Sequence, residues 1–201
     1  MDDHAHRRAT DHRQLDRLFG TDDVLPLWIA EPTLPPPAEV SAVLRSRAEV
    51  PWFGYEVRPR ALKESYWAWT ARHHGWLGEG VETSFSPSVG TSLAVAIELC
   101  TEPGEGVILQ PPVFTDFKPI IRRSKREPVT NPLVFHDGRY SMDLEHLAAV
   151  ASDPANRFMI LCNPHNPVGR TWTCEELAAV AEICAANDVV VFADEIHADL
   201  A

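Results

Sequence analysis

The feature that most restricts the fold of this chain is a strand–helix–strand unit near residue 200. Arg157–Cys162 and Val189–Ala193 are continuous apolar runs, and strands that are apolar without alternation are typical of parallel sheets buried on both faces. Between them, Thr173 and Glu176 form a T-x-x-E capping box before a helix over Leu177–Ala186. A crossover helix of this length joins parallel strands. The unit therefore predicts an α/β fold with a mostly parallel sheet covered by helices on both faces.

Upstream of this unit, hydrophobic spacing and turn residues predict further elements. Proline suits the first turn of a helix, so Pro35–Pro37 is expected to open one whose apolar stripe includes Val40, Val43 and Leu44. The segment between residues 124 and 140 has no clear pattern. The other expected elements are helices over Ala61–His74, Thr91–Cys100, Asp116–Arg123 and Leu144–Val150, and strands over Val81–Phe85 and Gly106–Gln110.

The charge balance argues against nucleic-acid binding. The 201 residues carry 29 acidic and 18 basic side chains, for a formal net charge of −11, whereas a nucleic-acid binder needs a basic stripe to neutralise phosphates. No apolar stretch reaches the length of a membrane span, and the N-terminus lacks the apolar segment of a signal peptide. We expect a cytoplasmic protein that binds neither nucleic acid nor membrane. One basic run is interpreted as a solvated helix end: Arg122, Arg123, Lys125 and Arg126.

The thiols and imidazoles do not form the pattern of a metal site. His4, His6 and His12 have no ordered set of carboxylate or thiolate neighbours, so a frayed polar terminus accounts for them and no metal is expected. The four cysteines include no CxxC pair and are predicted to be reduced core thiols: Cys100, Cys162, Cys174 and Cys184.

Three polar segments lie where the predicted strands end, which is where ligands bind in open α/β sheets. Ser86–Ser92 precedes an apolar helix, and its small residues and free N–H groups could bind a phosphate, although an ordinary helix cap explains them equally well. Cys162–Arg170 contains two Asn-Pro steps that fix an extended turn and present the amides of Asn163 and Asn166 at the sheet edge. We interpret this second segment as functional rather than as a plain turn.

The third polar segment, Ala193–His197, places Asp194 at the tip of a buried strand. A buried carboxylate is costly unless it has a cationic partner. A pyridinium nitrogen would serve, and a carboxylate that keeps it protonated makes the ring an electron sink. The alternative is a strand-end aspartate that caps the next element.

Together these segments resemble the aminotransferase class I and II superfamily of pyridoxal-phosphate (PLP) enzymes, of fold type I. Within it, the residue pattern is most similar to that of the C–S lyase branch, the cystathionine β-lyases of the MalY/PatB kind. The resemblance implies the three-layer sandwich of the PLP-binding large domain. It covers nearly the whole chain, through these blocks: Leu27–Glu31, Phe53–Tyr55, Thr101–Gly104, Gln110–Phe114, Cys162–Arg170 and Asp194–Leu200.

The resemblance also implies roles for single residues. Val89 and Gly90 would give backbone N–H groups to the cofactor phosphate, and Asn166 would hydrogen-bond the 3-oxygen of the ring. Asp194 would pair with the ring nitrogen. Phe114 would stack on the ring, where the family usually has tyrosine.

Three further residues carry the resemblance beyond the sheet edge. Tyr55 would reach the phosphate of a neighbouring subunit in a homodimer. Ala30 would lie by the substrate carboxylate, although Ala30-Glu31-Pro32 replaces the Ala-Asp-Met of most relatives in this branch. His197 belongs to the cofactor-binding set and stands where ordinary aminotransferases commonly have tyrosine, which favours the lyase branch.

The resemblance places the Schiff-base lysine some tens of residues beyond Asp194, and Lys63, Lys118 and Lys125 fit no such position. We therefore expect a truncated chain: residues 1–50 as an N-terminal arm and small-domain segment, and 51–201 as a partial PLP-binding domain. By family it would cleave cystathionine-like amino acids to pyruvate, ammonia and a thiol, with no catalytic lysine of its own. The alternatives are a class I/II aminotransferase and a non-catalytic partner subunit.

Overall fold

The computed structural model describes residues 7–32, 34–55, 57 and 59–201, and the chain forms two compact units, Met1–Arg58 and Pro59–Ala201. The first unit contains helices α1 (His12–Phe19) and α2 (Ala38–Ala48). Helix α1 is capped by the side chain of Asp11, which accepts a hydrogen bond from the N–H of Gln14. The helix predicted here is present as α2, but it begins after Pro37, its N-cap residue, rather than with the prolines in its first turn, and it buries none of its residues within the described structure.

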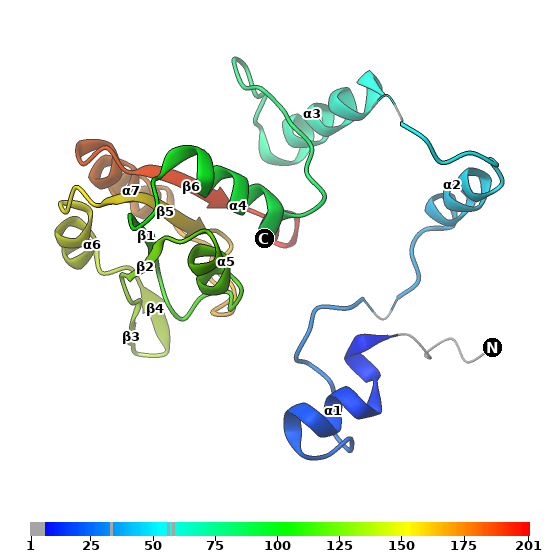
Figure 1. Ribbon diagram of the computed structural model, residues 1–201, viewed down its shortest axis with the longest axis horizontal. Coiled ribbons are helices and arrows are strands. Elements are labelled where there is room, and N and C mark those ends of the chain that lie inside the picture. Colours follow the sequence, from blue (N-terminus) through cyan, green and yellow to red (C-terminus); the bar gives the residue numbers. More distant parts are fainter. Residues whose placement is uncertain (1–6, 33, 56, 58) are drawn as a thin grey trace. The chain divides into compact units, whose positions relative to one another are not determined.

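The second unit is built on a parallel sheet (Figure 1). Its strands are β1 (Gly106–Leu109), β2 (Glu127–Thr130), β5 (Asn156–Cys162) and β6 (Val190–Asp194), in the order β2-β1-β5-β6, and every pairing is parallel. An antiparallel hairpin, β3 (Val134–His136) and β4 (Arg139–Ser141), lies outside this sheet. The helices are α3 (Arg60–His74), α4 (Val89–Cys100), α5 (Phe117–Arg123), α6 (Leu144–Ala151), α7 (Cys174–Ala186) and the short η2 (Ala198–Leu200).

Two hydrophobic cores form because successive side chains of each strand point to opposite faces. On one face, Phe158 and Ile160 of β5 pack with α4 and α5. On the other face, Met159 and Leu161 of the same strand pack with α6 and α7. The sheet is thus the middle of three layers, and the predicted α/β sandwich with a mostly parallel sheet is confirmed.

The β5–α7–β6 unit matches its sequence pattern closely. Thr173 accepts a hydrogen bond from the N–H of Glu176, and the carboxylate of Glu176 accepts one from the N–H of Thr173, so the capping box is present. The strands pair in register, with Cys162 opposite Asp194. This crossover sets the position of the two loops that follow β5 and β6.

Two expected elements differ in the structure. Val81–Phe85 is not a strand, because a strand needs a neighbour to complete its hydrogen-bond ladder and the sheet order β2-β1-β5-β6 does not include it. The unpatterned segment between residues 124 and 140 contains β2 and most of the β3–β4 hairpin. These strands are too short and too exposed to show an apolar period.

Two expectations about side chains were also wrong in part. Arg126 is buried rather than solvated, because its guanidinium hydrogen-bonds the backbone oxygens of Thr101 and Ser124. All four cysteines are free, but only Cys162 and Cys184 are core thiols. The other two are exposed and lie at helix ends, Cys100 as the last residue of α4 and Cys174 as the first residue of α7.

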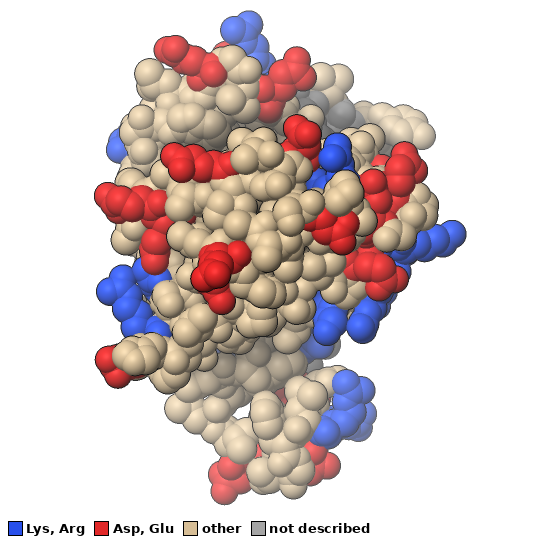
Figure 2. Space-filling model, turned by 90° about the vertical axis from the view of Figure 1, so that its left-hand side faces the viewer, with Lys and Arg blue, Asp and Glu red and all other residues tan. Residues whose placement is uncertain are grey.

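The surface agrees with the acidic composition. Figure 2 shows acidic side chains spread across one face, with basic side chains in separate groups at its margins rather than in a continuous stripe. Within the described ranges, no helix is both long enough and apolar enough to cross a membrane.

Candidate functional site at the carboxyl edge of the sheet

The carboxyl ends of β1, β5 and β6 meet at one edge of the sheet, because the three strands are adjacent and parallel. The loops after β5 and β6 are joined there by a hydrogen bond from the N–H of Asn163 to the backbone oxygen of Asp194, 3.0 Å long. Helix α4 ends just before β1 begins and packs on β5 and β6, so it runs against the strands and starts at this same edge. The topology therefore gathers the three polar segments singled out in the sequence.

The first turn of α4 offers two unused backbone donors. Ser88 caps the helix by accepting from the N–H of Thr91 at 3.1 Å, and its backbone oxygen accepts from the N–H of Ser92. The N–H groups of Val89 and Gly90 have no partner among the described residues. A Cβ added at Gly90 would meet Ile120 no closer than 3.5 Å, so packing does not require glycine there. Two free N–H groups at a helix start suit an anionic group.

The carboxylate of Asp194 is buried and has no cationic partner among the described residues. The residue is 6% exposed, and one carboxylate oxygen accepts from the N–H of Ile196 at 3.2 Å. No lysine, arginine or histidine of the described chain forms an ion pair with it. Burial of a carboxylate without a cation is unfavourable, so this position is suited to a cationic ligand group.

The charge of Asp194 also affects the pKa of Cys162, the residue opposite it on β5. Burial raises the pKa of the Cys162 thiol, the hydrogen bond from the N–H of Asn166 lowers it, and the charge of Asp194 raises it further; the net pKa is raised. This thiol is therefore a neutral packing group rather than a nucleophile.

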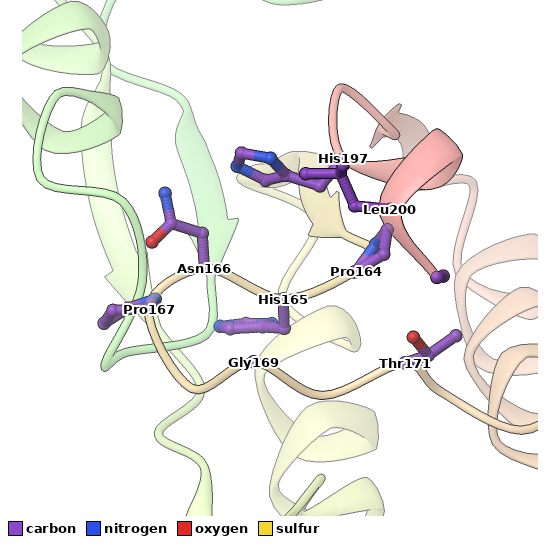
Figure 3. A pocket seen from close by; sticks show the side chains of 9 residues that line it. Pro164, His165, Asn166, Pro167, Gly169, Thr171, His197 and Leu200 are labelled. Carbon is purple, nitrogen blue, oxygen red and sulfur yellow. The ribbon is translucent and has the colours of Figure 1, made fainter. Parts of the chain in front are cut away.

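A pocket of about 290 Å³ lies beside this edge. The turn over residues 164–171 lines one side, and His197, Leu200 and Ala201 line the other. Figure 3 shows the side chains of Asn166 and His197 on the same side of the turn, with His165 on the inner side. The pocket thus brings together two predicted site residues from different loops, whereas Val89, Gly90, Phe114 and Asp194 do not line it.

Not every amide predicted at this edge is available to a ligand. The side-chain oxygen of Asn163 accepts from the N–H of Trp172 at 3.0 Å, so this amide oxygen is used inside the turn. Only Asn166 of the two asparagines lines the pocket. The prediction that both amides are presented was therefore wrong for Asn163.

His165 was missed by the sequence analysis. It is 1% exposed, and its Nε2 lies 3.0 Å from the backbone oxygen of Pro112, which follows β1. Burial lowers the pKa of His165, whereas nearby backbone oxygens raise it, and the net pKa is lowered. A neutral ring that donates from Nε2 therefore ties the turn to the loop after β1. Its place between two asparagines at a strand end was the one available signal.

The remaining predicted residues lie as follows. The ring of Phe114 is 41% exposed and packs edge-on against Phe117, with ring centres 5.4 Å apart. Tyr55 and Ala30 belong to the first unit, where both are exposed, and their roles stay predictions. The described residues hold no group of three or more His, Cys, Asp or Glu that could bind a metal.

Comparison with known proteins agrees with this geometry. The chain is 40% identical to cystathionine beta-lyase PatB of Bacillus subtilis (strain 168) over 183 residues, which is 91% of this chain and 47% of that protein. A PLP-bound putative aminotransferase from Clostridium difficile 630 superposes with a TM-score of 0.86 at 31% identity, over 98% of this chain and 51% of the other.

A PLP-bound C-S lyase from Staphylococcus hominis gives a TM-score of 0.81 at 25% identity, over 99% of this chain and 50% of the other. The chain therefore spans about half the length of the relatives it matches. The model of the family described as aminotransferase class I and II matches residues 32–201. The resemblance seen in the sequence is confirmed, and the chain belongs to the aminotransferase class I and II family.

Proposed function

We propose that this chain supplies part of the cofactor site of a PLP-dependent C–S β-lyase. The observation that carries the proposal is Asp194, a buried carboxylate with no cationic partner in the described part of the chain, at the edge where a helix start and Asn166 also lie. The identity to a cystathionine beta-lyase supports the lyase assignment. The substrate class proposed for the whole protein is a cystathionine-like amino acid, cleaved to pyruvate, ammonia and a thiol.

Each part of the edge suits one part of PLP. The free N–H groups of Val89 and Gly90 would bind the phosphate. Asn166 would donate to the 3-oxygen of the ring, and Phe114 would cover one ring face. Asp194 would hold a proton on the ring nitrogen. When bound, the cofactor supplies an electron sink for the substrate α-carbon.

The lysines present support non-covalent binding by these 201 residues. Lys63, Lys118 and Lys125 are all exposed, and none lines the pocket. We expect borohydride treatment with PLP, followed by mass spectrometry, to show no stoichiometric adduct on any of the three. A stoichiometric adduct on one of them would contradict this assignment of the site.

The binding site is tested by titrating the 201-residue chain with PLP. Asp194→Ala removes the partner of the ring nitrogen, and a hydrogen bond to a charged group contributes about 1.5–3 kcal/mol, so we expect binding weakened by roughly tenfold or more. Asp16→Ala, which removes an exposed carboxylate of α1, is the matched control. Equal PLP affinity in both variants would refute the proposed site.

The reaction is tested with a chimera of residues 1–201 and the remaining part of the Bacillus subtilis relative. Pyruvate release from cystathionine and keto-acid-dependent amino transfer are measured on the same preparation. We expect elimination to be the faster reaction, and Asp194→Ala to slow it by about a hundredfold or more. A second chimera, with an aminotransferase as donor, controls for bias from the added part. Faster amino transfer in both would refute the lyase assignment.

The second candidate function is amino transfer, because the Clostridium difficile structure is described as a putative aminotransferase.

Two further proposals concern the oligomeric state of the protein and its location in the cell. Exposed Tyr55 suits a homodimer in which it reaches the neighbouring phosphate. The four free thiols suit a reducing compartment, for which we propose the cytoplasm.

A further inference from the structure

The turn that carries Asn166 is closed by the backbone of Arg170. The N–H of His165 donates to the backbone oxygen of Arg170 at 2.7 Å, and the N–H of Gly169 donates to that of His165 at 2.8 Å. The N–H of Asn166 itself contacts only the Cys162 sulfur, at 3.5 Å, in the described structure. The placement of Asn166 therefore depends on where Arg170 is held.

The side chain of Arg170 is held on several sides. One guanidinium nitrogen donates to both carboxylate oxygens of Glu176, at 2.7 and 2.6 Å, and another donates to the backbone oxygen of Tyr140 at 2.6 Å. The guanidinium also lies over the ring of Trp172, 4.4 Å from its centre. The side chains of Arg170 and Glu176 are 13% and 24% exposed, so water screens this pair less than a surface ion pair.

Glu176 connects this pair to helix α7. The carboxylate oxygen that accepts from Arg170 at 2.6 Å also accepts from the N–H of Thr173, in the capping box. Burial raises the pKa of Glu176, but the hydrogen bonds from Arg170 and Thr173 outweigh it, and the pKa is lowered. An ionised Glu176 thus fixes the helix start and the turn with one group.

Trp172 holds the beginning of the same turn. Its N–H donates to the side chain of Asn163, and its indole N–H donates to the backbone oxygen of Cys162, each at 3.0 Å. Arg170 lies on the face of the indole ring, so one connected set of contacts links β5, the turn and α7. Asn166 lies in this turn and is one of the residues that line the pocket (Figure 3).

We propose that Glu176, acting through Arg170, is a positioning residue that holds Asn166 in place at the carboxyl edge of the sheet. The proposal rests on the function proposed above, in which Asn166 hydrogen-bonds the 3-oxygen of PLP. Glu176 touches no ligand itself. Its contribution is that the amide of Asn166 is already in place before the ligand arrives, which reduces the ordering cost of binding.

The test compares Glu176→Gln with Glu175→Gln in the 201-residue chain. Both remove one negative charge from the first turn of α7, but Glu175 is exposed and makes no ion pair with Arg170 within the described structure. We expect Glu176→Gln to speed hydrogen exchange of the amides in residues 163–170 and to weaken PLP binding by about fivefold. Glu175→Gln should change neither. Unchanged exchange in Glu176→Gln would overturn the proposal.

A thermodynamic cycle separates positioning from plain loss of stability. In the Asn166→Ala background, Glu176→Gln should weaken PLP binding no further, since there is no amide left to position. Val180→Ala, a core change on the same helix, controls for lower stability and should leave PLP affinity unchanged well below its unfolding midpoint. Additive effects of Glu176→Gln and Asn166→Ala would overturn the proposal.

The outcomes also distinguish a failure of the proposed function from a failure of the positioning role. If Asn166→Ala does not change PLP affinity, the proposed role of Asn166 is wrong, and the hydrogen-exchange comparison alone decides whether Glu176 holds the turn. If Asn166→Ala weakens binding and Glu176→Gln does not, the proposed function stands and the positioning role is wrong.

Discussion

Replacement of Arg126 by alanine should cost this chain far more stability than replacement of its basic neighbours. Arg126 is 4% exposed. Its guanidinium donates to the hydroxyl of Thr101 at 2.9 Å, to the carboxylate of Glu98 at 3.2 Å and to the backbone oxygens of Thr101 and Ser124. Arg126→Ala leaves the two buried backbone oxygens without this donor.

The expected loss follows from those contacts. An unsatisfied buried acceptor costs about 1–3 kcal/mol, and the pair with Glu98 adds little because Glu98 is largely exposed. With partial relaxation of the two oxygens, we expect a loss of about 3 kcal/mol in the free energy of unfolding. For a chain of this size that lowers the melting temperature by roughly 6–12 °C.

The assay is urea unfolding of the 201-residue chain followed by circular dichroism. Arg123→Ala, at an exposed position in the same basic run, is the matched control and should change stability by less than about 0.5 kcal/mol. Arg126→Lys should rescue only part of the loss, because a single ammonium cannot reproduce the planar fork. A loss below about 1 kcal/mol for Arg126→Ala would refute the reasoning.

Three further predictions follow from burial and exposure. Exposed Cys100 and Cys174 should react rapidly with a thiol reagent at pH 8. Cys184, whose pKa is raised to about 11 by burial, should react only on unfolding. Mass spectrometry of labelled peptides checks this prediction, and early labelling of Cys184 would contradict it. The pKa of His165 is lowered from its ordinary 6.5 by burial, so the neutral ring stabilises the fold above pH 6.5 and that stability is lost as the pH falls toward the lowered pKa. Urea midpoints measured from pH 7.5 to pH 5 should show this loss. If the midpoint of His165→Asn falls with pH as steeply as that of the parent chain, the loss does not come from His165. Val190 is 46% exposed on the edge strand β6, so Val190→Lys should reduce self-association of the chain. Sedimentation velocity measures this, with Val190→Thr as the control. Equal self-association of the two variants would show that the edge of β6 is not the surface that associates.

The parts of the fold predictable from sequence are those determined by local pattern. The capping box of Thr173 and Glu176 and the apolar run of β5 involve neighbouring residues only, and both are present. Val81–Phe85 has a similar local preference, but whether it becomes a strand depends on a neighbour elsewhere in the chain. A single window of sequence contains no such information.

The candidate site was predictable to the extent that it follows from topology. Parallel strands bring their carboxyl ends to one edge, so the loops bearing Asn166 and Asp194 were expected to meet there. The use of the Asn163 amide by Trp172 depends on the path of the turn. The burial of Arg126 depends on backbone oxygens, which every sequence has. Neither is visible in side-chain pattern.

The strand order also has a consequence for synthesis on the ribosome. Strands β1 and β2 are joined through α5, and β5 and β6 through α7, so each pair forms from nearby residues. The central pairing of β1 with β5 must wait until residues beyond 156 have emerged. During that interval the inner edge of β1 is open and lies among apolar side chains, a state that invites premature association. The nascent chain is thus most vulnerable between completion of its first strand pair and arrival of β5.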